Sequence, residues 1–269
     1  MSLGTLQGRN AIAPREFIQE SNMANGIYLY GIFPPSQCPD LHLEGLDHQP
    51  VQMCEMDDFM FLYSETQQDR YLASRKNLLG HERVLEQVMQ QGHPTLLPLQ
   101  FGLIISDWEM VRQQLTLPKG DSLKQLFSKL EGLREVSIKI FWEPEIELEL
   151  LMQENESLRT ERDRLEGRSL SMDQVVKIGQ LIEREMEKRK QAIVTQFQEA
   201  LNPLAIEIVE NDVLTEKMIY NAAYLIPWDA EPQFGEQIEI VDGQFENRLR
   251  LRYNNFTAPF NFAQLPDAN

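Results

Sequence analysis

A charged stretch with a leucine at every seventh position divides this sequence into two halves. Residues 145–168 are dense in Glu and Arg. The repeating leucines are Leu151, Leu158 and Leu165. This spacing predicts a long amphipathic helix, with Asn155 and Arg162 at the other core position of the heptad. Two structures fit it: a helix that packs on its own domain or in a helical hairpin, which is preferred, and an intermolecular coiled coil. Gly167 is expected to end the helix.

The sequence after this stretch predicts a second long helix and then strands. Ser171 is a good N-cap for a helix that runs to about Leu201 and is ended by Pro203. The apolar positions of this helix are Val175, Ile178, Ile182, Met186, Ile193 and Phe197. Strands are predicted at residues 204–211, 217–227 and 247–255, and a helix is preferred over a strand at residues 234–246. The result is an α+β C-terminal domain at residues 144–262, with a long coiled-coil-like helical insertion and a tail at residues 263–269.

The first half alternates between strand and helix patterns. Strands are predicted at residues 26–33, 51–65 (a pair with Asp57 and Asp58 at its turn), 95–105 and 134–143. Helices are predicted at residues 73–92, 106–115 and 122–132. Ser106 and Glu109 fit a capping box. This order predicts a ferredoxin-like N-terminal domain at residues 26–143, an antiparallel sheet with helices on one face, after a flexible tail at residues 1–25.

Two prolines stand at the entrance to the apolar segment at residues 93–105. Pro94 follows the predicted helix end at Gly92. Pro98 lacks a backbone donor, so we expect it at the entry of a strand or on a sheet edge. Gly102 predicts a bulge or a close approach of another group. The segment is therefore interpreted as a joint between a helix and a strand, with a scaffold role.

Charge and composition exclude several classes of protein. The chain has 42 acidic and 25 basic residues, a formal net charge of -17, which argues against nucleic acid and anionic membrane surfaces as partners. No apolar run is long enough to cross a membrane, and the first residues lack the apolar core of a signal peptide. Cys38 and Cys54 are too few for a disulfide scaffold. A soluble cytoplasmic protein is the expectation.

No motif in the sequence matches a known catalytic constellation. It contains no glycine-rich phosphate loop, nucleophile elbow, His-Glu-x-x-His or Cys-x-x-Cys motif. The side chains of zinc-ligand type that lie close in sequence are Cys38, His42, His48 and Cys54. Their spacing matches no common zinc module, so buried cysteines and solvated histidines are preferred and a zinc site is the alternative. His81 is expected to pack or cap near the start of its helix, because Glu86 is five positions away and would not face it.

Clusters of charge are interpreted as solvated surface. The carboxylates Glu143, Glu145, Glu147 and Glu149 and the pair Asp57 and Asp58 match no calcium or acid–base pattern. The cations Arg248, Arg250 and Arg252 alternate with apolar residues along one predicted strand. They balance the acidic excess of the chain itself, the preferred interpretation, or they meet an acidic partner. The sequence therefore predicts no catalytic, cofactor-binding or metal-binding residue.

Several segments, in order, resemble one known family. They are "GIYLYGIF", "HERVLEQVMQQGHPTLLPLQFGLII", "EVSIKIFWE", "NAAYLIP" and "RLRLRYNNFTAPFNF". The series is similar to the gas vesicle protein family GvpL/GvpF and extends over residues 26–262, with the GvpF type preferred. The most specific matches are His81, Val84 and Glu86 on a helix, followed by Pro98, Phe101 and Gly102. The chain departs from the family pattern at Gln100, where Arg is common, and at residues 258–262, a degenerate match to the family's C-terminal segment.

The resemblance implies a non-enzymatic protein without a cofactor. Members of this family are minor components or accessory factors of gas vesicles, the hollow protein shells that give buoyancy to aquatic microbes. The resemblance implies the same two-domain fold and contact with the hydrophobic main shell protein and other accessory proteins. It also implies a location in the gas vesicle, with the gas-facing side of the shell as one site. The alternative is a cytoplasmic ligand-binding or regulatory protein built on ferredoxin-like domains, a fold that hosts many functions.

Overall fold

The computed structural model of the chain describes residues 26–35, 41–165 and 171–265. These residues form two compact units. The first contains the described residues up to Val136, Tyr224–Trp228 and those from Asn255 onward, and the second contains Ser137–Ala223 and Asp229–Asn254. The tail predicted at residues 1–25 and the last four residues lie outside the described part. The predicted domain boundary at residues 143 and 144 stays a prediction.

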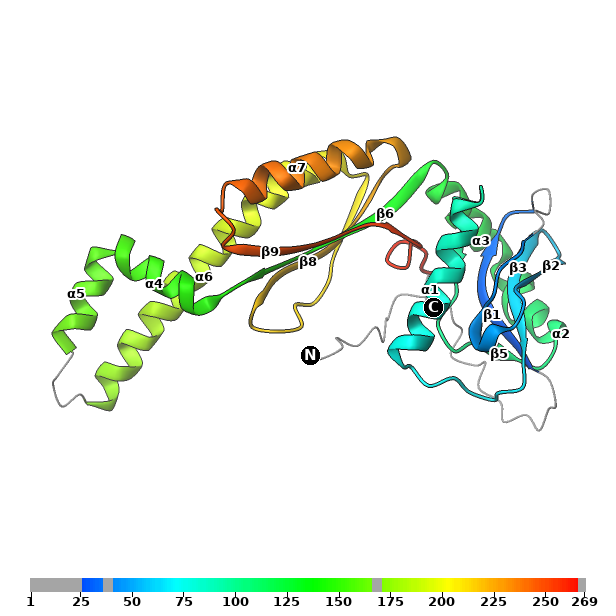
Figure 1. Ribbon diagram of the computed structural model, residues 1–269, viewed down its shortest axis with the longest axis horizontal. Helices are drawn as coiled ribbons and strands as arrows, with labels where there is room; N and C mark the ends of the chain where they lie inside the picture. The colour runs from blue at the N-terminus through cyan, green and yellow to red at the C-terminus, as the bar shows by residue number, and fades with distance from the viewer. Residues whose placement is uncertain (1–25, 36–40, 166–170, 266–269) are drawn as a thin grey trace. The chain divides into compact units, whose positions relative to one another are not determined.

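The first unit is built on an antiparallel sheet (Figure 1). Its strands are β1 (Gly26–Phe33), β2 (Gln52–Met56), β3 (Phe59–Thr66), β4 (Leu97–Pro98) and β5 (Ile104–Ile105). They lie in the order β2-β3-β1-β4, and β5 also pairs with β1. Asp57 and Asp58 form the tight turn between β2 and β3, as predicted. The aromatic strand β1 is thus central and supplies much of the core.

Helices cover both faces of this sheet, whereas the sequence predicted one face. They are α1 (Arg75–Gln90), α2 (Trp108–Val111), a π-helical segment (Arg112–Thr116) and α3 (Leu117–Leu130). Side chains alternate between the faces along β3. Met60 and Leu62 belong to the core cluster that contains the apolar side of α1. Phe59 contacts the ring of Phe127 on α3, and Phe61 that of Trp108 on α2. Since β3 carries apolar side chains on both sides, both faces need a cover.

The helical run after β5 differs from the prediction in its start and its continuity. Asp107, not Ser106, is the N-cap, because its carboxylate accepts a hydrogen bond from the backbone N–H of Met110. The run then continues from Trp108 to Leu130, where two separate helices were predicted. Pro118 is tolerated because it lies at the start of α3, directly after the π-helical turn, where the hydrogen-bond pattern changes.

The segment at residues 93–105 forms two short strands instead of the single strand predicted. β4 pairs with the second half of β1, and β5 pairs with its first half. Between them the chain turns at Gly102, whose φ of 88° lies in the left-handed region that glycine adopts without strain. Pro98 lies on the end strand β4, opposite Gly31, so its missing donor removes no pairing on the outer side. The edge position predicted for Pro98 is confirmed.

The second sheet has four strands in the order β7-β8-β6-β9. They are β6 (Leu133–Trp142), β7 (Glu207–Glu210), β8 (Met218–Pro227) and β9 (Leu249–Thr257). The helices are α4 (Pro144–Glu154), α5 (Glu156–Leu165), α6 (Met172–Leu201) and α7 (Glu231–Gly243). Along the chain, β6 is followed by α4 to α6, by β7 and β8, by α7 and finally by β9. This is the order of the split βαβ, ferredoxin-like arrangement. β6, which the sequence assigned to the first sheet, therefore pairs in the second.

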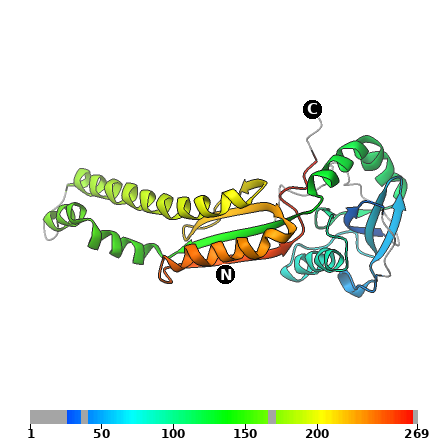
Figure 2. The ribbon, with the colours of Figure 1, turned by 90° about the horizontal axis from the view of Figure 1, so that it is seen from above.

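The charged stretch folds into a helical hairpin with α6 (Figure 2). Its small core contains Leu148, Leu151, Met152 and Leu158 on one side and Ile178, Leu181, Ile182 and Met186 on the other. The single helix predicted here is interrupted at Asn155, whose Oδ1 accepts a hydrogen bond from the backbone N–H of Leu158. Asn155 is thus a helix cap and not a heptad core residue. The hairpin, the preferred of the two interpretations, is observed, and the predicted break at Gly167 lies outside the described residues.

The long helices α6 and α7 lie on one face of the second sheet (Figure 1). Ser171 caps α6 in a capping box with Gln174, which confirms the predicted cap. Phe197 of α6 stacks on Phe245, just after α7, with ring centroids 5.9 Å apart. α7 confirms the preferred helix, and it buries Phe234, Ile238 and Val241. None of the helices in the described ranges combines the length and the apolar character needed to cross a membrane.

Candidate functional site

The zinc-ligand side chains are not gathered among the residues that the structure describes. His42 and His48 are exposed, and Nδ1 of His48 lies 3.0 Å from a carboxylate oxygen of Glu44. Cys54 is a free, half-buried thiol on β2, and burial raises the pKa of this thiol, which disfavours the thiolate that binds metals. Cys38 lies outside the described residues. Within them, no group of three or more His, Cys, Asp or Glu side chains is placed to hold a metal ion.

The carboxylates at the turn between β2 and β3 are paired with cations. Asp57 accepts a hydrogen bond from the hydroxyl of Thr116 and lies 3.4 Å from Nε of Arg112. Asp58 lies 2.5 Å from Nζ of Lys124. These partners belong to the π-helical segment and to α3, so the turn is tied to the helices on its face of the sheet. The pairs are partly exposed, so each contributes little stability by itself.

His81 lies in a buried chain of hydrogen bonds within the first unit. Its Nδ1 is 2.9 Å from the hydroxyl of Tyr28, and its Nε2 is 3.1 Å from the carbonyl oxygen of Leu99. The backbone N–H of Gly102 donates to the same Tyr28 hydroxyl at 3.1 Å. A carbonyl oxygen only accepts, so Nε2 carries the proton and Nδ1 accepts from Tyr28. The chain of donors thus runs from Gly102 through Tyr28 and His81 to Leu99, and it ties α1 to the turn between β4 and β5.

Burial sets the acid–base behaviour of this chain. Only 2% of the His81 surface is exposed, and desolvation lowers the pKa of its imidazole to about 4, although the bond to Leu99 opposes this. Desolvation also raises the pKa of Tyr28. Both side chains are therefore neutral at pH 7. The rings of Tyr30 and Phe101 lie 5.5 and 5.9 Å from the imidazole, centroid to centroid, and enclose it. The arrangement gives His81 a packing role, which is the interpretation that the sequence favoured.

A buried carboxyl group anchors the C-terminal segment of the first unit. Glu135 on β6 is 3% exposed, and its two oxygens accept from the backbone N–H and the side-chain amide of Asn261, at 2.9 and 2.6 Å. Desolvation raises the pKa of Glu135 to about 8 against the effect of these two bonds. Asn261 lies in residues 258–262, which match the family pattern only loosely. The contact nevertheless gives this segment a defined attachment.

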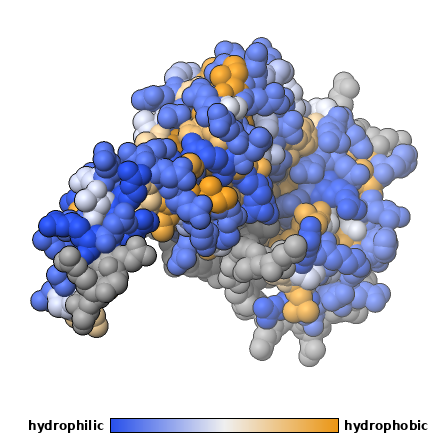
Figure 3. All heavy atoms as spheres, turned by 60° about the vertical axis from the view of Figure 1, so that its left-hand side comes forward, coloured by the Kyte–Doolittle hydropathy of each residue, from blue (hydrophilic) through white to orange (hydrophobic). Residues whose placement is uncertain are grey.

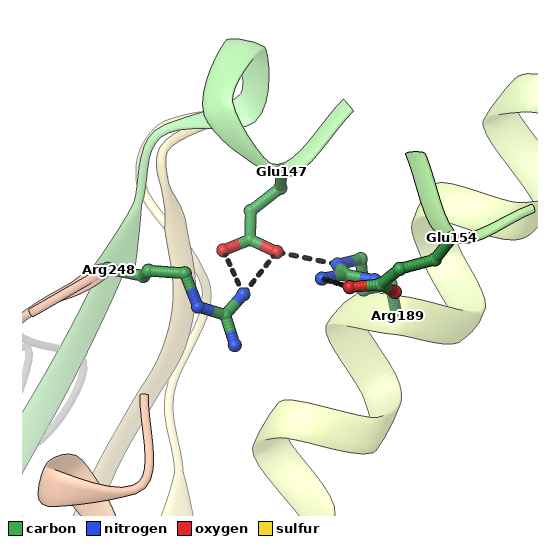
Figure 4. Close-up of polar contacts among 4 residues, drawn as sticks. All are labelled: Glu147, Glu154, Arg189 and Arg248. Carbon is green, nitrogen blue, oxygen red and sulfur yellow. Dashed lines mark hydrogen bonds and ion pairs between the residues drawn. The ribbon is translucent and has the colours of Figure 1, made fainter. Parts of the chain in front are cut away.

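Glu147 is the centre of a second buried network, in the second unit (Figure 4). Its side chain is 1% exposed, so the solvated surface predicted for the acidic cluster is wrong at this position. Arg189 on α6 donates to it from Nε at 2.6 Å, and Nη1 of Arg248 lies 2.7 and 2.8 Å from its two oxygens. Arg189 also donates to Glu154 at 2.6 Å, which lowers the pKa of Glu154. The network joins α4, α6 and Arg248, the residue directly before β9.

Arg250 and Arg252, which lie on β9, have different contacts from those of Arg248. Arg250 and Arg252 are exposed. Their guanidinium carbons lie 4.7 and 5.2 Å from the centroid of the Phe141 ring on β6. In the described part of the chain, neither guanidinium lies within 4.0 Å of a carboxylate oxygen. Arg248 thus balances acidic charge inside the chain, as preferred from the sequence, whereas Arg250 and Arg252 form no ion pair with the described residues.

Apolar side chains are also exposed on the second unit. Figure 3 shows separate hydrophobic patches on a mostly hydrophilic face. Ile206, Val213 and Leu214 are 66%, 53% and 48% exposed and flank β7 in the chain. β7 is a four-residue strand at one end of the sheet. An open strand edge beside apolar side chains is a common form of protein-binding surface.

A match to a known protein family shows where this chain belongs. The model of the gas vesicle synthesis protein GvpL/GvpF matches residues 26–264. This chain belongs to the GvpL/GvpF family. Gas vesicle protein F of Dolichospermum flosaquae is 56% identical to it over 243 residues, 90% of this chain and 99% of that protein. Gas vesicle protein F of Haloferax mediterranei is 19% identical over 245 residues, 90% of this chain and 95% of that protein.

Two solved GvpF structures share the fold of this GvpL/GvpF member. The crystal structure of GvpF from Anabaena sp. PCC7120 is similar with a TM-score of 0.84 and 52% identity, over 90% of this chain and 99% of that one. The crystal structure of GvpF from Microcystis aeruginosa is similar with a TM-score of 0.78 and 52% identity, over 89% of this chain and 99% of that one. The resemblance found in the sequence and the predicted α+β class, with two sheets and a long helix, are both confirmed.

Proposed function

We propose that this chain is a minor structural or assembly protein of the gas vesicle that associates with the hydrophobic main shell protein. Membership of the GvpL/GvpF family over residues 26–264 is the observation that carries the proposal. Relatives at 52% and 56% identity are named gas vesicle protein F, which supports the same setting. We propose a non-enzymatic role, because His81, the histidine of the family-like helix, is 2% exposed and hydrogen-bonded through both ring nitrogens.

The exposed apolar residues beside β7 support a contact with a hydrophobic subunit. We call Ile206, Val213 and Leu214 the apolar edge. β7 is an end strand, so in the described chain its outer backbone groups have no strand partner. An incoming segment of the shell protein would gain backbone hydrogen bonds along this edge and bury apolar area on either side of it. Covering that segment would also protect it from pairing with other copies of itself.

Copurification with the tagged main shell protein tests the association. The native chain is expected to be retained, and the triple variant I206S, V213S, L214S is expected to bind roughly tenfold more weakly, because about 1.4 kcal/mol or more of apolar burial is lost. Ile240→Ser is the control, since Ile240 is 50% exposed but lies on α7. Failure of the native chain to bind, together with normal vesicles in a deletion strain, contradicts the proposed function. Binding that the triple variant retains contradicts only the apolar edge as the contact.

The proposed location is the gas vesicle, on the gas-facing side of its shell. Antibodies reach an inward-facing protein only after vesicles are collapsed by pressure. We therefore expect immunolabelling of collapsed vesicles and none of intact ones. Label on intact vesicles contradicts the gas-facing location. Absence of label in both states contradicts lasting incorporation and favours a factor that leaves after assembly.

A further inference from the structure

The face of the second sheet that α7 does not cover carries a group of cations on an aromatic ring. Tyr253 on β9 stacks on Phe234 of α7, so the even-numbered neighbours Arg250 and Arg252 point to the opposite face. Both guanidiniums lie over Phe141 of β6. Lys139 is two positions before Phe141 on β6 and shares its face. We call Lys139, Phe141, Arg250 and Arg252 the cationic platform.

Among the residues that the structure describes, the cations of this platform lack the carboxylate partners that other surface cations have. The protein has 42 acidic residues against 25 basic ones, and many of its exposed cations are paired with carboxylates. Among the described residues, no ion pair involves Lys139, Arg250 or Arg252. Glu143 raises the pKa of Lys217, and the positive charge of Arg250 acts against this rise. Arg250 therefore lies near a second cation. Two guanidiniums placed on one ring without a carboxylate repel each other, and an anion between them would remove that repulsion.

The geometry of the platform selects an extended ligand. β9 is an end strand of its sheet, so in the described chain its outer edge is open to a further strand. Arg250 and Arg252 are two positions apart and share one face, the spacing at which an extended peptide also repeats its side chains. Stacking on Phe141 restricts both guanidiniums before a ligand arrives, which lowers the entropy lost on binding.

We propose that the cationic platform binds an extended acidic segment of a partner protein, with carboxylates at alternate positions on Arg250 and Arg252. Guanidinium groups bind carboxylates through paired hydrogen bonds, so a segment with Glu or Asp at every second residue fits this spacing. Nucleic acid is disfavoured because a chain of net charge -17 repels a phosphate backbone over its whole length. The platform lies on β9 at one end of the sheet and the apolar edge lies on β7 at the other, so this inference does not depend on the contact proposed for the shell protein.

Fluorescence anisotropy with labelled synthetic peptides tests the inference on the full chain. One peptide carries Glu at alternate positions, a second replaces each Glu by Gln, and a third has the same composition with the Glu residues adjacent. The native chain is expected to bind the alternating peptide at least tenfold more tightly than either control peptide, and binding should weaken as salt rises. Equal binding of all three peptides overturns the inference, and so does a failure of the native chain to bind the alternating peptide.

Matched variants assign the binding to the platform. The double variant R250A, R252A is expected to lose at least tenfold in affinity, because charge-assisted bonds are removed. The double variant R162A, R164A changes the net charge equally but removes exposed arginines of α5 that are paired with Asp163 and Glu161, and it should bind as the native chain does. If the alanine variant does not fold, the double variant R250K, R252K replaces it in the test. An intermediate loss of affinity is then expected, because lysine keeps the positive charge but cannot form the paired hydrogen bonds of a guanidinium group. Equal losses in the two double variants overturn the inference.

Two other ligands are distinguished in the same experiment. Tighter binding of a single-stranded oligonucleotide than of the alternating peptide would overturn the proposal in favour of phosphate recognition. Sedimentation of the native chain as a dimer that R250A, R252A dissociates would overturn it in favour of a second copy of this chain. A monomer that binds the alternating peptide in preference to the oligonucleotide supports it.

Discussion

The hydroxyl of Tyr28 lies 2.9 Å from Nδ1 of His81 in the core of the first unit. Through this bond one imidazole links β1, α1 and the turn that contains Gly102, because His81 also contacts Leu99 and Tyr28 also contacts Gly102. His81 and Gly102 are among the residues on which the family resemblance rested. His81 is 2% exposed and hydrogen-bonded through both ring nitrogens, and the N–H of the half-buried Gly102 donates to Tyr28, so these contacts hold the fold together.

Replacing His81 by glutamine removes a buried titration. The folded pKa of His81, about 4, lies below its ordinary value of 6.5, so the unfolded chain binds more protons between these pH values. The stabilisation from the neutral imidazole is fully present above pH 6.5 and is lost as the pH falls to 4, by about 3 kcal/mol. We expect the difference in unfolding free energy between the native chain and His81→Gln, measured with guanidinium chloride, to shrink by this amount between pH 7 and pH 4.

His48→Gln is the matched control for this experiment. His48 is exposed and forms a surface ion pair with Glu44, so its replacement should change the unfolding free energy by less than about 1 kcal/mol at either pH. If the difference between the native chain and His81→Gln were the same at pH 7 and pH 4, the neutral, buried imidazole would be disproved.

Glu135 is expected to act in the opposite direction to His81. Its folded pKa of about 8 lies above the ordinary 4.5, so the native state holds a proton that the unfolded chain has released. The stabilisation from this group is fully present below pH 4.5 and is lost as the pH rises to 8, by roughly 5 kcal/mol. Between pH 4.5 and 6.5 the slopes of the two groups have opposite signs and cancel. Glu135→Gln should therefore reveal the loss of stability on acidification that His81 causes.

Unfolding free energies of the native chain and Glu135→Gln at pH 5, 6.5 and 8 check this prediction. Gln has almost the shape of the protonated acid but does not titrate, so the difference between the two proteins measures the titration of Glu135. We expect the stability of the native chain relative to the variant to decrease steadily from pH 5 to pH 8. A relative stability that increases over this range would mean that the carboxyl group is ionised in the folded protein.

Local signals in the sequence predicted most of the elements of this fold. The N-cap at Ser171, the turn at Asp57 and Asp58, and the helix stop at Gly92 depend on neighbouring residues, and they are found as predicted. Asn155 was misread because heptad spacing and capping compete for the same polar residue, and only the packing of α4 and α5 on α6 decides between them. β6 was assigned to the wrong sheet because its alternation says which face is buried and not which strands it pairs with.

The buried polar groups could not be found from sequence because their partners are far away in the chain. Asn261, which donates to Glu135, lies 126 positions after it. Arg189 and Arg248 follow Glu147 by 42 and 101 positions. In the sequence these glutamates look like their solvated neighbours, such as Glu145 and Glu149, since nothing local distinguishes them. The edge position of Pro98, in contrast, was predictable, because proline restricts its own place in a sheet.

Removing the carboxylate of Glu147 is expected to destabilise the second unit strongly. Glu147→Ala leaves Arg189 and Arg248 without their buried partner, and breaking one side of such a pair costs about 3 kcal/mol or more. Glu149→Ala, at an exposed position of the same helix, should change stability by less than about 0.5 kcal/mol. Urea unfolding of both variants makes the comparison. Equal effects would show that Glu147 is solvated, as its acidic neighbours are.

The same substitution, glycine to alanine, is expected to have opposite effects at two positions. A β-carbon added at Gly102 or at Gly179 meets no atom within 4 Å, so neither change introduces a clash. Gly102 has a φ of 88°, which disfavours alanine by about 1 kcal/mol or more. Gly179 lies inside α6, where alanine stabilises a helix by up to about 1 kcal/mol relative to glycine. Chemical unfolding should therefore show a loss for Gly102→Ala and a gain for Gly179→Ala. A gain at Gly102 would mean that the turn between β4 and β5 does not use the left-handed conformation.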